Sequence, residues 1–300
     1  MRDFIQHKAS ELGFAAVGFA AAAASESYTR YQTWLQRGYA GEMHFMMRQA
    51  AARAHPARLL PSVKSLIMVA AHYAPASPAS HWSGHVSARD YHSVLRAKLR
   101  QLAQAIHARE PLQSRVCVDS APLLEREWAR RAGLGWIGKQ GSLVHPQYGC
   151  GLLLGALLVD LELEPSASQP NQCGDCQLCL KACPAGALRP DGLLDARRCV
   201  AYLTIEHRSA IPPSLQPALG GMLFGCDRCT AICPWNKAGE LMPELRAPAW
   251  PGPAECLALT AQDFERRFAE TTVHRLGLAR LQRNARIALQ NSAAPASPAP

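Results

Sequence analysis

In the first half of this 300-residue chain, segments in which apolar residues recur with helical spacing alternate with short apolar runs of strand length. Phe4, Ile5, Lys8 and Leu12 have helical spacing and predict an N-terminal helix. Further helical periods span 29–37, 43–53, 91–107 and 122–131. Apolar runs of strand length span 15–19, 65–73, 115–118 and 152–161. Helices and strands that alternate in this way predict an α/β domain.

The longest of these helices has the clearest buried face. Five apolar residues within 91–107 recur at helical intervals: Val94, Leu95, Leu99, Leu102 and Ile106. Such a stripe is typical of a helix that packs with one side against a core. The segment 75–87, which precedes this helix, reads as a loop.

The pattern changes after the last predicted strand. Residues 164–172 (Glu-Pro-Ser-Ala-Ser-Gln-Pro-Asn-Gln) have the composition of a linker and mark a domain boundary. Beyond Trp235 the periods are helical, and the last residues are rich in Ser, Ala and Pro, which predicts a disordered tail. The predicted units are an α/β domain, a cysteine-rich module, a helical end and the tail, at 1–163, 164–239, 240–291 and 292–300.

Composition limits the class of protein. Apolar residues make up 48% of the chain, which is ample for a core. No apolar run approaches the ~20 residues that span a bilayer, so we expect no membrane segment. The formal charge of +9, with 32 lysines and arginines, favours an anionic partner such as nucleic acid. A generally basic surface would give the same charge.

Eight of the eleven cysteines lie between residues 173 and 233. The first four have the spacing Cys-x2-Cys-x2-Cys-x3-Cys-Pro, in which the fourth cysteine belongs to the other of two iron–sulfur clusters. The eight residues are Cys173, Cys176, Cys179, Cys183, Cys199, Cys226, Cys229 and Cys233. The sequence therefore predicts two [4Fe-4S] clusters.

The second half of this cysteine pattern is irregular. Leu223 stands three residues before Cys226, where a ligand is expected, and its side chain cannot bind iron. Cys199 would supply the missing thiolate. The first cluster is then predicted on Cys173, Cys176, Cys179 and Cys233. The second cluster is predicted on Cys183, Cys199, Cys226 and Cys229.

Structural zinc and a disulfide framework are the other interpretations of these cysteines. Zinc sites use two pairs of ligands joined by a longer loop, not three thiols within seven residues followed by Cys-Pro. Disulfides need an oxidising compartment, and the polar start of the chain has no apolar signal region, so we expect reduced thiols and a cytoplasmic protein. The remaining three are expected to be small core residues: Cys117, Cys150 and Cys256.

Residues that could form a site, such as aspartate and glycine, are most concentrated in the segment 118–139. Asp119 lies between a predicted strand and a helix expected to open at Pro122, where carboxylates commonly cap helices. Capping lowers the pKa of a carboxyl group, so Asp119 can donate a proton only if burial against a ligand outweighs that effect. The glycines of Gly133-x-Gly135-x-x-Gly138 follow a helix rather than a strand, which excludes a dinucleotide fingerprint.

Longer motifs across nearly the whole chain resemble the epoxyqueuosine reductase family. In the first domain they are Gly41-Glu42-Met43, Arg53, Leu59-Leu60-Pro61, Arg89-Asp90-Tyr91-His92, and the segments 118–122 and 132–139. In the cysteine-rich module they are the segments 195–199, 202–207 and 225–229, and Cys233-Pro234-Trp235-Asn236. The sequence departs from the family at Gln140-Gly141, where His or Asn followed by a small polar residue is expected.

The resemblance implies a nitroreductase-like α/β domain that holds cobalamin, a ferredoxin-like module with two [4Fe-4S] clusters and a short HEAT-like helical end. Within this end, 281–291 resembles the start of a HEAT-type helix pair. It implies reduction of epoxyqueuosine to queuosine at the wobble position of tRNA, the last step of queuosine biosynthesis. An external electron donor is expected. We also expect a monomer with no membrane partner.

The resemblance also implies roles for individual residues. Asp119 matches the proton donor proposed for the family. The implied cofactor contacts are Arg53, Asp119, Lys139, Leu143, Leu154, Tyr202, Thr204, Glu206, Cys226 and Asp227. Candidates for contacts with tRNA phosphates are Arg197, Arg198, Arg208, Arg266, Arg280 and Arg283.

Three other classes of protein share some of these features. A respiratory reductive dehalogenase would use the same cofactors, but it normally carries a twin-arginine export signal, whereas this chain starts with Arg2 alone. An electron-transfer subunit would leave the first domain without a role. A redox-sensing nucleic-acid-binding protein would explain the clusters and the charge, yet the sequence has no helix-turn-helix or other DNA-reading motif.

Overall fold

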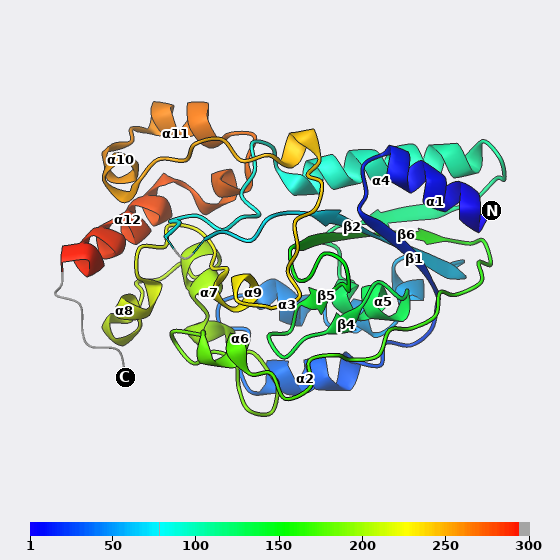
Figure 1. Cartoon of the computed structure of the whole chain (residues 1–300), viewed down its shortest axis with the longest axis horizontal. Coiled ribbons are helices and arrows are strands. Elements are labelled where there is room, and N and C mark those ends of the chain that lie inside the picture. Colours follow the sequence, from blue (N-terminus) through cyan, green and yellow to red (C-terminus); the bar gives the residue numbers. More distant parts are fainter. Residues whose placement is uncertain (78, 294–300) are drawn as a thin grey trace.

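The computed structural model describes residues 1–77 and 79–293, and a four-stranded antiparallel sheet lies at the centre of the first domain (Figure 1). The strands follow the order β1-β2-β6-β3. Their bounds are Ala16–Ala21 (β1), Ser65–His72 (β2), Ser114–Cys117 (β3) and Leu152–Val159 (β6). The short strands β4 (Trp136–Ile137) and β5 (Leu143–Val144) pair separately. The four strands predicted from the sequence are thus confirmed, with small shifts at their ends.

Five α-helices belong to the described part of the first domain, 1–77 and 79–163. They are α1 (Arg2–Glu11), α2 (Tyr28–Gln36), α3 (His44–Arg48), α4 (Tyr91–His107) and α5 (Glu125–Arg131). The bounds predicted for the long helix α4 are confirmed, and its five predicted core residues are buried. The Asp90 side chain caps α4 by accepting a hydrogen bond from the His92 amide.

Both faces of the sheet are covered. Every residue of β2 is buried. Ile67 and Val69 pack into one core with α1 and α4, whereas Leu66 and Met68 pack into a second core with α5. Because β2 is buried on both sides, its sequence is a continuous apolar run rather than an alternation of apolar and polar residues.

Two predicted helices differ from the structure. The segment 43–53 is divided into α3 and a 3-10 helix at Ala51–Ala54, and the Arg53 guanidinium donates to the Gln49 carbonyl between them. The helix expected from Pro122 begins only at Glu125. Before it, the amides at 120 and 123 donate to carbonyls two residues earlier, which makes tight turns in place of a helix.

The cysteine-rich module contains only short α-helices. They are α6 (Leu178–Lys181), α7 (Val200–Ile205), α8 (Gln216–Leu219) and α9 (Arg228–Ala231). The helices α6 and α9 pack against each other. Each ends just before a Cys-Pro pair, because the residue that precedes a proline disfavours helical backbone.

The helical end consists of α10 (Pro253–Ala258), α11 (Ala261–Phe268) and α12 (Leu278–Ala293). The helix α12 packs along α10. It includes Ser292 and Ala293, so the tail predicted at 292–300 is wrong for these two residues, and 294–300 lie outside the described residues. Within 1–77 and 79–293, no helix has the length and apolar character needed to cross a membrane.

The predicted units share their cores. Trp82, from the segment 75–87, is buried among residues of α10, α11 and α12, and its indole donates to the Pro251 carbonyl (2.9 Å). Conversely, Met242 of the helical end packs into the core of the first domain beneath α1 and α4. These crossings hold the cysteine-rich module and the helical end against the first domain, so side chains from different units can form one site.

Candidate functional site

Asp119 lies on an exposed turn between β3 and α5. Its φ of +52° is in the left-handed region, which aspartate tolerates better than most residues. Its amide donates to Glu125 Oε1 (2.8 Å), and its side chain is 58% exposed. The N-cap of α5 is Leu124. Asp119 therefore does not cap this helix, and the capping interpretation is wrong.

His92 connects Asp119 to a second carboxylate. His92 Nε2 lies 2.9 Å from Asp119 Oδ2, and His92 Nδ1 lies 2.5 Å from Asp90 Oδ1. Because carboxylates accept hydrogen bonds, this geometry needs either two N–H groups on His92 or a proton on one carboxyl group. The Arg275 guanidinium donates to Asp90 Oδ2 (3.1 Å). The Asp90–His92–Asp119 line therefore shares a proton.

The surroundings favour the charged forms of both His92 and Asp119. Burial acts to lower the pKa of His92, but its hydrogen bonds to Asp119 and Asp90 outweigh burial and raise the pKa. The part of the Asp119 carboxyl group that lies against protein acts to raise its pKa, but the hydrogen bond and charge of His92, helped by Arg275 and Arg126, lower it. The two shifts therefore favour a protonated His92 beside an ionised Asp119.

Two further carboxyl groups interact with Asp119. Burial, followed by the negative charge of Asp119, raises the pKa of Glu125 to about 8. The same two causes raise the pKa of Glu206, which follows α7 in the cysteine-rich module. A carboxyl group with a raised pKa holds its proton closer to neutral pH. The structure thus brings Glu206, a predicted cofactor contact, to Asp119 from another unit.

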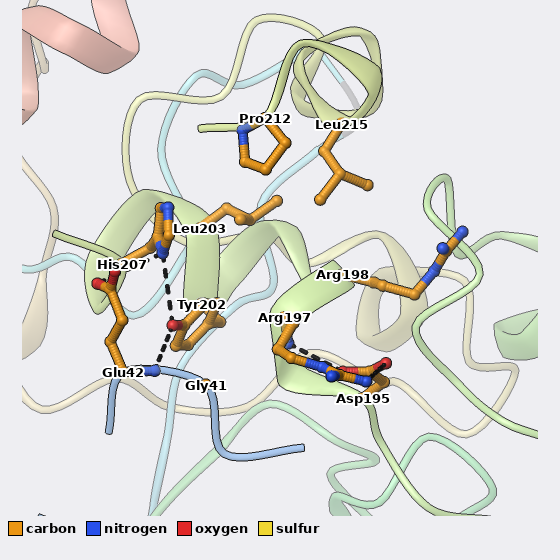
Figure 2. Close-up of a pocket in the computed structure, with 10 residues that line it drawn as sticks. All are labelled: Gly41, Glu42, Asp195, Arg197, Arg198, Tyr202, Leu203, His207, Pro212 and Leu215. Carbon is orange, nitrogen blue, oxygen red and sulfur yellow. Dashed lines mark hydrogen bonds and ion pairs between the residues drawn. The ribbon is translucent and has the colours of Figure 1, made fainter. Parts of the chain in front are cut away.

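Tyr202, another predicted contact, lines a pocket of about 450 Å³ between α7 and the turn at Gly41 and Glu42 (Figure 2). The Glu42 amide donates to Tyr202 Oη (2.7 Å). His207 Nδ1 lies 3.4 Å from the Glu42 carboxylate on the same side. Figure 2 shows the pair of Arg197 and Asp195 at another side of the pocket. The pocket joins the first domain to the cysteine-rich module.

Thr204 and Asp227 are buried and hold the backbone in position. Thr204 Oγ1 accepts a hydrogen bond from the Gly225 amide (3.0 Å). The Asp227 carboxylate accepts from the Ser83 hydroxyl (2.5 Å) through one oxygen and from the Gly84 amide (2.7 Å) through the other. Both side chains therefore bind protein groups, and their predicted contact with a cofactor stays a prediction.

Three predicted contacts of the first domain have packing roles. Arg53 is buried, and its guanidinium lies 5.5 Å from the ring centroid of Tyr31. Leu143 is buried in the core beneath α5. Leu154 is half-buried on β6 and pairs with Ala70. As cofactor contacts these residues stay predictions.

Lys139 lies at the loop that carries the first cysteine run. Its Nζ donates to the carbonyls of Gly174 (2.6 Å) and Cys176 (2.9 Å). The ammonium group therefore holds this loop against the turn between β4 and β5. The structure gives Lys139 a role beside the predicted first cluster, and its predicted contact with cobalamin stays a prediction.

All eleven cysteines are free thiols, and the eight patterned ones make up the two predicted ligand groups. Burial and the charges of Cys199, Cys226 and Cys183 raise the pKa of Cys229. These four residues are the predicted ligands of the second cluster, and Cys226 is also a predicted cofactor contact. In the first group, burial raises the pKa of Cys179, and the charges of two further predicted ligands add to this effect. The disulfide interpretation is therefore wrong.

The surroundings of the first group suit an iron–sulfur cluster. Cys173 and Cys233 pack against one small core of Trp136, Val144 and Cys150. The buried Trp136 indole N–H has no hydrogen-bond partner in the described part of the chain, and a cluster sulfur would satisfy it. Within 1–77 and 79–293, no three His, Cys, Asp or Glu side chains converge on a position for a single metal ion.

Sequence reasoning missed several residues of the site. Asp90 and His92 belong to a motif quoted above, but nothing in the motif indicates that both reach Asp119. A signal was present, because an aspartate at the start of α4 places His92 two residues later, in the first turn. Arg275 and Glu125 have no comparable signal, since only tertiary packing brings Arg275 to Asp90.

Two family models match parts of the chain. The model described as "4Fe-4S double cluster binding domain" covers residues 172–236. The model described as "Epoxyqueuosine reductase QueG, DUF1730" covers residues 53–120. The first match shows that the cysteine-rich module is a domain for two [4Fe-4S] clusters. The second spans α4 and Asp119.

Curated relatives and a solved structure match most of the chain. An epoxyqueuosine reductase of Alicycliphilus denitrificans is 38% identical and covers 96% of this chain, with 86% of the relative matched. That of Escherichia coli K12 is 39% identical and covers 94%, with 79% of the relative matched. A crystal structure of epoxyqueuosine reductase with an epoxyqueuosine-modified tRNA-Tyr stem loop has a TM-score of 0.90, 29% identity and coverage of 97% and 81% of the two chains.

Proposed function

Because this chain belongs to the epoxyqueuosine reductase family, we propose that it reduces epoxyqueuosine to queuosine at the wobble position of tRNA, as the last step of queuosine biosynthesis. The observation that carries the proposal is the Asp90–His92–Asp119 line, which places a carboxyl group with a shared proton on an exposed turn. The same turn interacts with Glu206 of the domain for two [4Fe-4S] clusters. The enzyme is an oxidoreductase.

Nucleoside analysis of tRNA tests this function. A strain that lacks the gene should accumulate epoxyqueuosine at the wobble position, and the wild-type chain should restore queuosine. Mass spectrometry distinguishes the two nucleosides, because the reaction removes one oxygen atom. Normal queuosine in the deletion strain would contradict the proposal.

Cobalamin is the proposed reductant at the substrate. When bound, it would supply strongly reduced cobalt for the reductive opening of a strained epoxide, and the two clusters would supply single electrons. The residues present suit it, because Tyr202 lines a pocket at the junction of two units, and the charge of the exposed Asp119 acts on Glu206 across that junction. In this proposal the first domain is nitroreductase-like, the second ferredoxin-like and α10–α12 HEAT-like. Anaerobic reconstitution followed by a visible spectrum tests cobalamin binding.

Asp119 is the proposed acid. An opened epoxide places negative charge on oxygen, and this oxygen must be protonated before it leaves as water. Asp119 can receive a proton at Oδ2 from His92 Nε2 and pass it to the departing oxygen. Asp90 and Arg275 hold His92 in place from the other side. His92 is thus a positioning residue that stores the proton, and Asp119 is the catalytic residue.

This arrangement predicts a pH dependence. The pKa of His92 is raised above its ordinary 6.5, so the stored proton is present below that raised pKa and is lost as pH rises through it. Single-turnover rates of the wild type should therefore be constant at lower pH and fall along an alkaline limb above pH 6.5. His92→Gln keeps a hydrogen-bond donor for Asp119 but has no transferable proton and does not titrate, so it should lower the rate and remove this limb. A wild-type limb centred below pH 6.5 would contradict the assignment.

The structure reduces the set of arginines that can contact tRNA phosphates. Arg280 donates to the carbonyls of Leu276 and Ile205, and Arg283 donates to those of His207 and Ser209. These two guanidinium groups connect α12 to the cysteine-rich module, so their prediction as phosphate contacts is corrected. Other arginines predicted to contact phosphates are more exposed. Arg197 and Arg266 each pair with an aspartate, and Arg208 lies exposed after α7.

Binding of the tRNA anticodon arm should depend steeply on salt. Basic residues release counterions when they neutralise phosphates, so we expect affinity to fall about tenfold or more between low and physiological ionic strength. Arg208→Ala and Arg266→Ala should weaken binding and reduce the salt slope, whereas Arg109→Ala, after α4, serves as the control. Titration of a labelled stem loop at several salt concentrations measures both effects. Binding that does not change with salt would contradict the electrostatic account.

We also propose the setting in which the chain works. Free thiols and a tRNA substrate favour the cytoplasm. Reduction of the clusters requires an external electron donor, and we propose a monomer. Light scattering on the chain with and without the stem loop tests the oligomeric state.

A further inference from the structure

Cys150, one of the three cysteines outside the cluster pattern, is buried beside the first cysteine run. It lies just before β6 and is 3% exposed. With Trp136 and Val144 it forms the small core against which Cys173 and Cys233 pack. The expectation of a small core residue is correct but incomplete, because Cys150 also contacts a proposed ligand of the first cluster.

Three contacts hold Cys150 in position. Its amide donates to Asn236 Oδ1 (2.9 Å), and Asn236 follows Cys233 within one turn. Gly149 approaches the same residue so closely that a Cβ on it would lie 2.4 Å from Asn236 Oδ1. Gln140, which is also buried, donates through Nε2 to Cys150 Sγ (2.8 Å). The thiol is therefore held relative to the Cys233 turn.

Gln140 determines what the Cys150 thiol can still do. A thiol is both a weak donor and a weak acceptor, and Gln140 uses the acceptor side of this sulfur. The S–H group is left to donate, and its neighbour Cys233 is a thiolate when it binds iron. Cys233 packs against the small core that contains the Cys150 thiol, so its thiolate is an acceptor available to that S–H group.

We propose that Cys150, oriented by Gln140, donates a hydrogen bond to the Cys233 thiolate and raises the reduction potential of the first [4Fe-4S] cluster. This inference rests on the proposed assignment of Cys233 to that cluster. Hydrogen bonds to the sulfurs help to set the potentials of such clusters. The reduced cluster carries one more negative charge, so a donor stabilises it more than the oxidised cluster. Cys150 is a positioning residue for electron transfer and is not a ligand.

Redox titration of the anaerobically prepared full chain, followed by electron paramagnetic resonance, tests this role. Cys150→Ala should make reduction of one cluster about tenfold less favourable, which corresponds to about 59 mV for one electron. Cys150→Ser keeps a donor and should stay closer to the wild type. Gln140→Met removes the orienting amide and should shift the same potential in the same direction. Cys256→Ala, at a buried cysteine of the C-terminal core, should change neither potential.

Several results would overturn the inference. Unchanged potentials in Cys150→Ala with full iron content show that the thiol has no effect on the cluster. Loss of about half the iron in both Cys150→Ala and Cys150→Ser shows that Cys150 is a cluster ligand rather than a hydrogen-bond donor. If Cys150→Ala does not retain clusters, Gln140→Met decides, and unchanged potentials there overturn the role. The titration involves no tRNA, so failure of the proposed function would appear separately, as wild-type enzyme that does not convert epoxyqueuosine.

Discussion

Asp119→Asn is expected to lower the rate of a single turnover by roughly a hundredfold or more, the usual size of a general-acid contribution. The variant removes the group that receives a proton from His92 and passes it to the departing oxygen. Asparagine also tolerates the left-handed backbone at this position, where φ is +52°, so the turn should keep its shape. The measurement uses pre-reduced enzyme, because a single turnover then bypasses electron delivery and isolates the chemical step.

Two comparisons make this result specific. Asp3→Asn, on an exposed position of α1, should leave the rate unchanged. Iron content of Asp119→Asn should match the wild type, because Asp119 is not one of the patterned cysteines, and cobalamin binding should be retained because asparagine has nearly the same shape as aspartate. A wild-type rate in Asp119→Asn would remove Asp119 from the mechanism. Helix capping would then offer no alternative role, since α5 begins at Glu125.

Cys199→Ser is expected to reduce iron from about eight to about four atoms per chain and to abolish turnover supported by an electron donor. Cys199 lies among Cys183, Cys226 and Cys229, whose charges act on one another. Loss of one thiolate should remove the second cluster and leave the first. Iron and acid-labile sulfide analysis of anaerobically prepared protein, with the signal of the reduced clusters, measures the change.

The control for this experiment is Cys256→Ser, at a buried cysteine outside the pattern. It should keep about eight iron atoms and normal turnover. A Cys199→Ser chain that retains both clusters and full activity would show that the crossed ligand assignment is wrong. Loss of both clusters would instead indicate that the module does not fold without the second one.

The pattern of apolar residues was sufficient to predict a helix or strand wherever one segment determines its own structure. The bounds of α4 follow from its apolar stripe and from Asp90, which caps it. The buried strand β2 follows from a continuous apolar run. Pattern was insufficient at 122–131, where the amide of residue 123 bonds within a tight turn and α5 starts three residues late. Periodicity does not register such turns, because they depend on single hydrogen bonds.

Assignments of individual side chains depended on partners far away in the sequence. Lys139 is expected at a corrin, and only the structure shows that its ammonium group also donates to carbonyls of the first cysteine loop. Arg280 and Arg283 were expected at phosphates, but they bond carbonyls of the cysteine-rich module. A long cationic side chain reaches many acceptors, and the sequence does not say which of them tertiary packing brings within range.

By itself, the sequence determined the two-cluster module, because a short cysteine spacing places several thiolates around one centre whatever surrounds them. It also identified Asp119 as an unusual carboxylate on a turn. Only the tertiary structure decided that His92 and Asp90 hold the proton beside Asp119, and that Cys150 lies against Cys233. The physical reason is separation along the sequence. Most cluster ligands lie a few residues apart in the chain, whereas the proton line and the thiol contact need residues that only folding brings within hydrogen-bond distance.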